Sequence, residues 1–156
     1  FDGPLALSGA IANGRAVLAA RAMGADFGYV GSAFIATREA HASDEYKQSI
    51  VESGAQDIVY TNLFTGVHGN YLRASIERAG LDPEHLPESD PSKMSFASDK
   101  TKAWRDIWGS GQGIGAVVHV PSAGELVARL AREYDEALRA LTAEATAAAH
   151  PSTSSG

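Results

Sequence analysis

The sequence predicts an α/β fold in which a helix joins two parallel strands. Two short apolar runs, at residues 5–11 and near residues 27–30, have the length and composition of strands rather than helices. About a dozen residues separate the two runs, which is the spacing of a β-α-β unit and implies parallel strands. Each run ends in a turn of small residues, Ser8-Gly9-Ala10 in the first and Gly31-Ser32 in the second.

The composition fits one globular domain. The chain has 156 residues, of which 44% are hydrophobic, enough for a core and too many for a disordered chain. A net charge of −6 argues against a nucleic-acid partner. The absence of cysteine excludes disulfides, thiolate metal sites and cysteine nucleophiles. With no apolar run long enough for a bilayer and no signal peptide, we expect a cytoplasmic protein without a membrane partner.

The first residues indicate whether this chain is a complete protein or part of a longer one. It opens on Phe1 and enters its first strand within a few residues. Parallel strands need further strands beside them. We therefore expect residues 1–156 to be the C-terminal part of a longer protein.

Capping residues place the next elements. Asn13 can cap a helix that ends at Gly24 and carries Ala20 and Met23 on its apolar side. Ser43 can cap a second helix, whose first turn is acidic as the helix dipole favours. Beyond it, the pattern predicts an extended segment at 57–64, a turn at 66–69 and a short helix at 71–79.

The second half of the chain reads as an excursion and a long helix. Residues 81–98 carry three prolines and are expected to form a surface excursion. Ser122 and Glu125 have the spacing of a capping box, which opens an amphipathic helix over residues 122–141. We place the domain at residues 1–141 and expect residues 142–156 to form a frayed tail.

The two glycine turns are the first candidates for function. Glycine at positions 9 and 31 lets backbone amides approach an oxyanion closely, and the hydroxyl of Ser32 adds a donor. Parallel strands end at the same edge of a sheet, so the two turns can hold one phosphate between them. Ordinary turns between strands and helices explain the same pattern equally well.

Other candidates are weaker. The glycines of residues 109–115 follow a helix rather than a strand, which argues against a dinucleotide loop. Gln112 in this loop is either a contact to a heterocycle or a solvated turn residue. Tyr46 and Lys47 either border a cavity at the strand ends or are a packed tyrosine and a solvated lysine.

The histidines do not predict a metal site, because none has a ligand spacing with another ligand on one helical face. His68 lies between two glycines and is the best placed of the five to enter a site, although for each histidine a surface or structural role is favoured. A Gly-x-Ser-x-Gly nucleophile motif is absent. The five histidines are His41, His68, His85, His119 and His150.

Several segments resemble the C-terminal third of nitronate monooxygenases. The similar segments are Leu7-Ser-Gly-Ala-Ile-Ala-Asn-Gly-Arg15, Ala25-Asp-Phe-Gly-Tyr-Val-Gly-Ser-Ala-Phe-Ile-Ala-Thr37, Glu39, Tyr46-Lys47, Phe64-Thr-Gly66, Leu72-Arg73 and Ser110-Gly-Gln-Gly-Ile-Gly115. They cover the chain nearly to Tyr134. FMN-dependent enoyl reductases and related quinone reductases share these segments.

The resemblance implies the C-terminal part of an FMN-dependent TIM (β/α)8 barrel, with its last two βα units followed by mainly helical segments. The backbone amides of Gly9, Ala10, Gly31 and Ser32 would hold the FMN phosphate, and Gln112 would lie near the flavin. Ala10 and Ser32 replace a frequent glycine and a frequent threonine of the family.

The resemblance also implies an activity. The complete enzyme would oxidise alkyl nitronates with dioxygen, with the flavin carrying the redox chemistry. The family's catalytic histidine would lie upstream of Phe1, so this chain alone would be inactive; the complete protein could form a homo-oligomer. The alternatives are an NAD(P)H-dependent flavin reductase, acting on an enoyl or quinone substrate, and a non-catalytic phosphate- or nucleotide-binding module.

Overall fold

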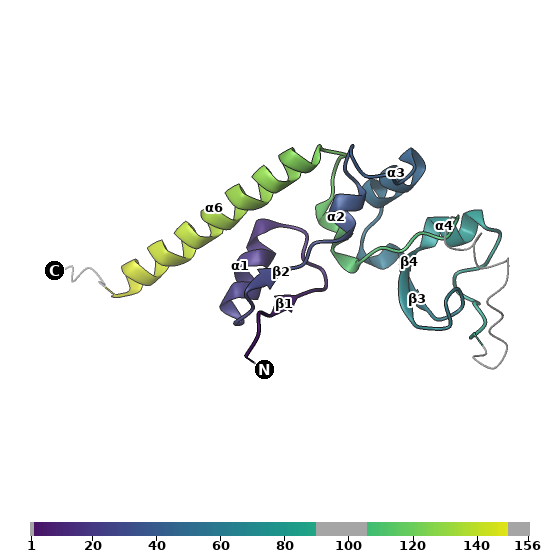
Figure 1. Ribbon diagram of the computed structural model, residues 1–156, viewed down its shortest axis with the longest axis horizontal. Helices are drawn as coiled ribbons and strands as arrows, with labels where there is room; N and C mark the ends of the chain where they lie inside the picture. Colours follow the sequence, from purple (N-terminus) through teal and green to yellow (C-terminus); the bar gives the residue numbers. More distant parts are fainter. Residues whose placement is uncertain (1, 90–105, 150–156) are drawn as a thin grey trace, which may run out of the picture.

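A computed structural model describes residues 2–89 and 106–149. Figure 1 shows an elongated arrangement in which the long helix α6 (Ala123–Ala149) runs beside α1 (Gly14–Ala22). Beyond these helices follow α2 (Ser32–Ile35) and α3 (Asp44–Glu52), and a small hairpin lies at the end farthest from the C-terminus. No helix in the described ranges combines the length and the apolar character that crossing a membrane requires.

The N-terminal unit is the predicted β-α-β unit. Strand β1 (Ala6–Leu7) pairs in parallel with β2 (Phe27–Gly28), and α1 connects them. The α/β prediction is therefore confirmed, but both strands are shorter than the expected ranges 5–11 and 27–30. Leu5, which precedes β1, is 51% exposed, and Phe27 in β2 is 60% exposed. In a two-stranded sheet both strands are edges, and nothing in the described residues covers this face.

Helix α1 begins as the sequence predicts and packs against α6. The side chain of Asn13 accepts a hydrogen bond from the amide of Ala16 at 2.8 Å, and Ala20 is buried. Met23 is 75% exposed, so its assignment to the apolar side is wrong. The helices cross so closely at Gly14 that a Cβ there would lie 2.2 Å from the carbonyl oxygen of Leu130.

The segment between the β-α-β unit and α6 forms a second small unit. The predicted cap of α3 is confirmed, because Ser43 Oγ accepts from the amide of Tyr46. The helix predicted at 71–79 is wrong at its start, because residues 69–72 pair with the preceding strand. The elements after α3 are η1 (Ala55–Asp57), β3 (Ile58–Thr61), β4 (Gly69–Leu72), α4 (Arg73–Arg78) and η3 (Gln112–Ala116).

The buried core lies where these elements meet α6. Its largest cluster contains residues from α2, α3, β4, η3 and α6, so it joins distant parts of the chain. The buried members of this cluster are Ala33, Ala36, Ile50, Leu72, Trp108, Ile114, Val117 and Leu126. A smaller cluster of Tyr71, Ile76 and Ile107 lies under the hairpin.

The C-terminal helix is longer than predicted. The capping box is confirmed: Glu125 N donates to Ser122 Oγ at 3.1 Å, and Ser122 N donates to Glu125 Oε2 at 2.6 Å. Helix α6 then continues to Ala149 rather than ending at residue 141, so the expected frayed tail is helical as far as it is described. Within the predicted excursion, residues 81–89 hold no helix or strand, and residues 90–98 lie outside the described part.

Candidate functional site

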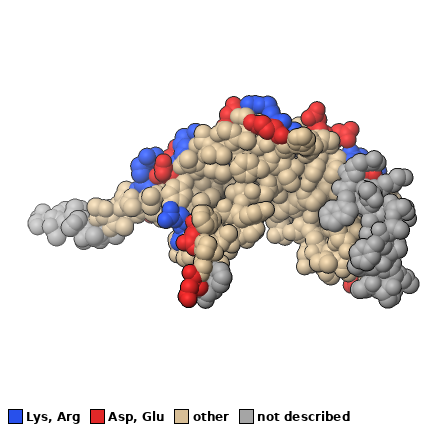
Figure 2. Space-filling model, in the orientation of Figure 1, with Lys and Arg blue, Asp and Glu red and all other residues tan. Residues whose placement is uncertain are grey.

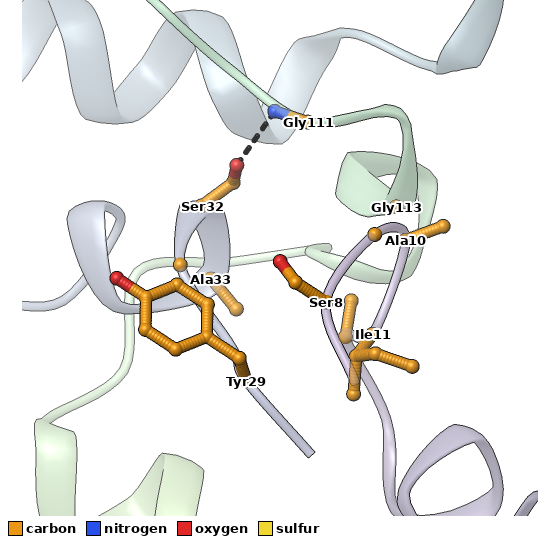
Figure 3. Close-up of a pocket in the computed structure, with 11 residues that line it drawn as sticks. Ser8, Ala10, Ile11, Tyr29, Ser32, Ala33, Gly111 and Gly113 are labelled. Atoms are coloured by element: carbon orange, nitrogen blue, oxygen red, sulfur yellow. Dashed lines mark hydrogen bonds between the residues drawn. The ribbon is translucent and has the colours of Figure 1, made fainter. Parts of the chain in front are cut away.

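A cavity of about 120 Å³ lies at the carboxyl ends of β1 and β2 (Figure 3). We call it the glycine cavity. The four residues predicted to hold a phosphate, Gly9, Ala10, Gly31 and Ser32, all line it. Its full lining is Ser8, Gly9, Ala10, Ile11, Ala12, Tyr29, Gly31, Ser32, Ala33, Gly111 and Gly113.

The turn after β1 has an unusual backbone. Gly9 has a φ of +106° and Ala10 a φ of +52°, two consecutive residues in the left-handed half of conformational space. Glycine takes such a conformation freely, whereas alanine there is strained by about 1–2 kcal/mol. The amides of Gly9, Ala10, Gly31 and Ser32 have no hydrogen-bond partner among the residues that the structure describes. These donors are therefore available to a ligand.

Two hydroxyl groups add to the wall of the glycine cavity. Ser32 Oγ accepts a hydrogen bond from the amide of Gly111 at 2.8 Å, drawn dashed in Figure 3. A serine hydroxyl has one O–H donor in addition to its acceptor lone pairs. Ser32 can therefore accept from Gly111 and still donate to an anion. Ser8 directs its hydroxyl toward the space between the two turns (Figure 3), and the ring of Tyr29 lines the opposite side. Sequence reasoning missed Ser8 and Tyr29 as site residues, although Ser8 opens the small-residue turn.

The glycine loop at 109–113 closes the glycine cavity. A Cβ on Gly113 would lie 2.8 Å from the carbonyl oxygen of Ala10, so the loop packs directly on the β1 turn. At the other end of the loop, Ser110 N donates to the carbonyl of Asn70 at 3.1 Å. Gln112 lies between two lining glycines, but its side chain is exposed and does not line the cavity.

The start of α1 is not free for a ligand. The amide of Gly14 donates to Glu133 Oε2 at 2.8 Å, and Asn13 holds the amide of Ala16. A carboxylate from α6 thus takes the place that an anionic ligand would occupy at a helix start. Anion binding in the glycine cavity therefore depends on the turn amides.

The glycine cavity is uncharged. On the face drawn in Figure 2, charged side chains lie along the upper edge and on the lower left projection, and the middle of the face carries none. No lysine, arginine, aspartate or glutamate of the described ranges lines the cavity. An anion in the cavity therefore meets no carboxylate in the described wall. Nor do three metal-binding side chains come together anywhere in the described residues.

A second cavity, of about 520 Å³, lies between α3, β4 and the glycine loop. We call it the aromatic cavity. Tyr46 stacks on Trp108 with ring centroids 5.0 Å apart, and its hydroxyl donates to the carbonyl of Gly109. Burial raises the pKa of Tyr46 to about 12. The lining residues are His41, Ala42, Ser43, Tyr46, Tyr71, Ile107, Trp108 and Gly109.

The other two predicted cavity residues lie elsewhere. Lys47 is buried and donates from Nζ to the carbonyl of Arg38 at 3.3 Å, so it faces away from Tyr46. Adjacent residues of a helix point about 100° apart, which separates the pair. His68 is exposed and stacks on Tyr60, with centroids 4.9 Å apart. Neither Lys47 nor His68 lines the glycine cavity or the aromatic cavity.

Comparison with known proteins identifies the family of this chain. The family model for nitronate monooxygenase matches residues 2–133. The chain belongs to the nitronate monooxygenase family. This family consists of oxidoreductases, and the resemblance drawn from the sequence is confirmed.

Curated relatives match over most of this chain but are longer. A probable nitronate monooxygenase of Staphylococcus saprophyticus is 27% identical over 85% of this chain and 39% of its own length. A nitronate monooxygenase of Paraburkholderia phytofirmans is 27% identical over 88% of this chain and 40% of its own. The chain therefore spans about two fifths of the length of these relatives.

Solved structures share the fold. A nitroalkane oxidase from Streptomyces ansochromogenes superposes with a TM-score of 0.69 at 30% identity, covering 90% of this chain and 42% of that one. FabK from Thermotoga maritima superposes with a TM-score of 0.69 at 22% identity, covering 92% and 48%. The second likeness concerns the fold alone.

Proposed function

We propose that this chain forms the phosphate-binding end of the flavin site in an FMN-dependent nitronate monooxygenase. In this proposal β1 and β2 are the last two strands of a (β/α)8 barrel. Family membership supports the activity class. The observation that carries the site assignment is that two turns about twenty residues apart, Gly9-Ala10 and Gly31-Ser32, line one cavity where two parallel strands end.

The glycine cavity fits a phosphate group. It offers unpartnered backbone amides from two turns and the hydroxyl of Ser32, which are the donors that hold phosphates in backbone nests. Its volume of about 120 Å³ suits a small group rather than a whole flavin. When bound, FMN would supply the redox chemistry that oxidises an alkyl nitronate with dioxygen.

The catalytic base is proposed to lie outside this chain. No histidine of the described residues lines the glycine cavity, and His41 reaches only the aromatic cavity. We therefore expect the 156-residue chain alone to turn over no nitronate, while the protein that carries it does. The competing function is NAD(P)H-dependent reduction of an enoyl or quinone substrate, the alternative that the sequence leaves open. Parallel assays with nitronate and with NAD(P)H distinguish the two.

The phosphate assignment is tested by comparing FMN with riboflavin, which lacks the phosphate. The protein that carries this chain should bind FMN more tightly than riboflavin. Ser32→Ala should weaken FMN binding by about tenfold or more, the value of a hydrogen bond to a charged group, and leave riboflavin binding nearly unchanged. Flavin fluorescence titration measures both affinities.

Ser49→Ala is the matched control, because Ser49 lies on α3 outside the glycine cavity. It should alter neither affinity. Equal binding of FMN and riboflavin by the unmodified protein would rule out a phosphate site in the glycine cavity.

A further inference from the structure

The aromatic cavity has the size of a small-molecule site. Its volume of about 520 Å³ falls within the range of about 300–1,000 Å³ that is usual for such sites. The glycine cavity, at about 120 Å³, is too small to hold an organic substrate as well as a phosphate.

The walls of the aromatic cavity are mostly apolar and aromatic, with the imidazole of His41 as a further polar group, and they favour an apolar occupant. No lysine, arginine, aspartate or glutamate of the described residues lines it. The hydroxyl of Tyr46 is used by Gly109, and that of Tyr71 lies 3.4 Å from Thr65 Oγ1. Ser43 Oγ caps α3. The tyrosine and serine side chains thus have partners in the wall, and the rings supply apolar contact area.

The aromatic wall is held in place before any ligand arrives. Trp108 donates its amide to the buried Ser75 Oγ at 3.0 Å, and its carbonyl accepts from the amide of Leu72 at 2.8 Å. The guanidinium of Arg78 lies 4.0 Å from the centre of the Trp108 ring, and Tyr46 stacks on the same residue. A wall fixed by backbone and ring contacts loses little freedom on binding.

The two cavities share one loop. Gly109 lines the aromatic cavity, while Gly111 and Gly113 line the glycine cavity. We infer that the aromatic cavity binds the hydrocarbon part of the organic substrate. This inference rests on the proposed function, which identifies the substrate as a nitronate. It predicts that the enzyme accepts nitronates with extended alkyl or aryl groups and not only the smallest ones.

A filled cavity tests this inference. Ala42→Phe places a ring in the aromatic cavity, and Ala74→Phe adds the same ring on the exposed side of α4 as a control. In the protein that carries this chain, KM for primary nitronates should fall about fourfold per added methylene, the factor for burying one such group. Ala42→Phe should abolish this dependence on chain length, and Ala74→Phe should keep it.

A second readout does not depend on turnover. The neutral fluorescent probe N-phenyl-1-naphthylamine should bind about tenfold more weakly to Ala42→Phe than to Ala74→Phe. This factor corresponds to the apolar burial that the probe loses when the new ring fills the cavity. Equal probe binding by the two variants overturns the inference. A loss confined to Ala42→Phe, in a protein that turns over no nitronate, supports the cavity and refutes the proposed function. Should Ala42→Phe not fold, Ala42→Leu takes its place, with a smaller loss expected.

Discussion

Tyr46 is a partly buried tyrosine whose ring and hydroxyl both contact the glycine loop region. Its ring stacks on Trp108 and its hydroxyl donates to Gly109, so it supports one end of the loop that borders both cavities. The phenol is neutral in this setting. Burial opposes the charged phenolate and raises the pKa of Tyr46 from 10.0 to about 12.

This raised pKa predicts a loss of stability at high pH. A group whose pKa is higher in the folded state contributes stability that is complete below the unfolded-state pKa and is lost as pH rises through the folded-state pKa. The Tyr46 contribution should therefore be constant below pH 10.0 and decline toward a pH of about 12. Urea denaturation from pH 8 upward measures it.

Tyr46→Phe is the partner experiment. Losing the hydrogen bond to Gly109 should lower the free energy of unfolding at neutral pH by about 1 kcal/mol. The difference between wild type and variant should then shrink between pH 10.0 and about 12. A difference that stays constant over this pH interval would show that Tyr46 does not ionise with unfolding.

At the residue scale, the sequence predicted that Gly9 and Gly31 stand where strands end, but not which side chains share a cavity. Gly9 and Gly31 stand at strand ends, a position that follows from local pattern. Lys47 and His68 were expected at a cavity and lie elsewhere, because their orientation depends on packing between distant segments. Ala10 shows a further limit: its positive φ follows from the turn and the glycine loop packed on it, not from alanine itself.

The crossing of α1 and α6 governs the N-terminal unit at the scale of elements. Gly14 sits where the two backbones meet, and Glu133 on α6 accepts from its amide. Arg129 on the same helix donates to the carbonyls of Ala12 and Ala116. One helix therefore binds the backbone on both sides of the glycine cavity.

Gly14→Ala should be strongly destabilising. The new Cβ would lie 2.2 Å from the Leu130 carbonyl oxygen and 2.3 Å from the Tyr134 nitrogen, both backbone atoms that cannot move aside alone. We expect a loss of about 3 kcal/mol or more, at the upper end for overpacking. Gly115→Ala is the control, because nothing lies within 4 Å of a Cβ there; it should change stability by less than about 0.5 kcal/mol. Thermal and urea unfolding compare the two, and similar losses would contradict the close crossing.

Elements with local signals were predicted well, and elements made by pairing were not. The caps at Asn13, Ser43 and Ser122 lie beside the groups they bind, so the sequence alone locates them. Strand β4 was expected to be helical in part, because its partner β3 and the bridge from Tyr71 to Gly109 come from outside the local window. The short length of β1 likewise reflects how few residues find a partner strand.

At the scale of the whole molecule, the β1–β2 face is exposed apolar surface. Phe27 is 60% and Tyr29 65% exposed, close to the exposed Leu5. Both strands also present unpaired edges. Such a face drives association when nothing covers it.

We therefore predict that the 156-residue chain, prepared alone, self-associates through this face. Phe27→Glu should shift it toward monomer by placing a charge on the apolar surface. Val67→Glu adds the same charge at the distant hairpin loop, where Val67 is 71% exposed, and should leave association unchanged. Sedimentation velocity measures the distribution; a monomeric wild-type chain would contradict the prediction.

The hydrogen bond from Gly111 to Ser32 has a consequence for how this protein can vary. It joins the two ends of the segment that contains α2, α3, the hairpin and α4, so nearly eighty intervening residues begin and end at one point. Because loop-closure entropy rises slowly with length, about 0.6 kcal/mol per doubling, the connections between these elements can lengthen with little penalty, whereas the packed residues of the core, such as Ile50 and Leu72, cannot be removed. The base of the segment stays fixed at Ser32 and Gly111 while the length of these connections changes.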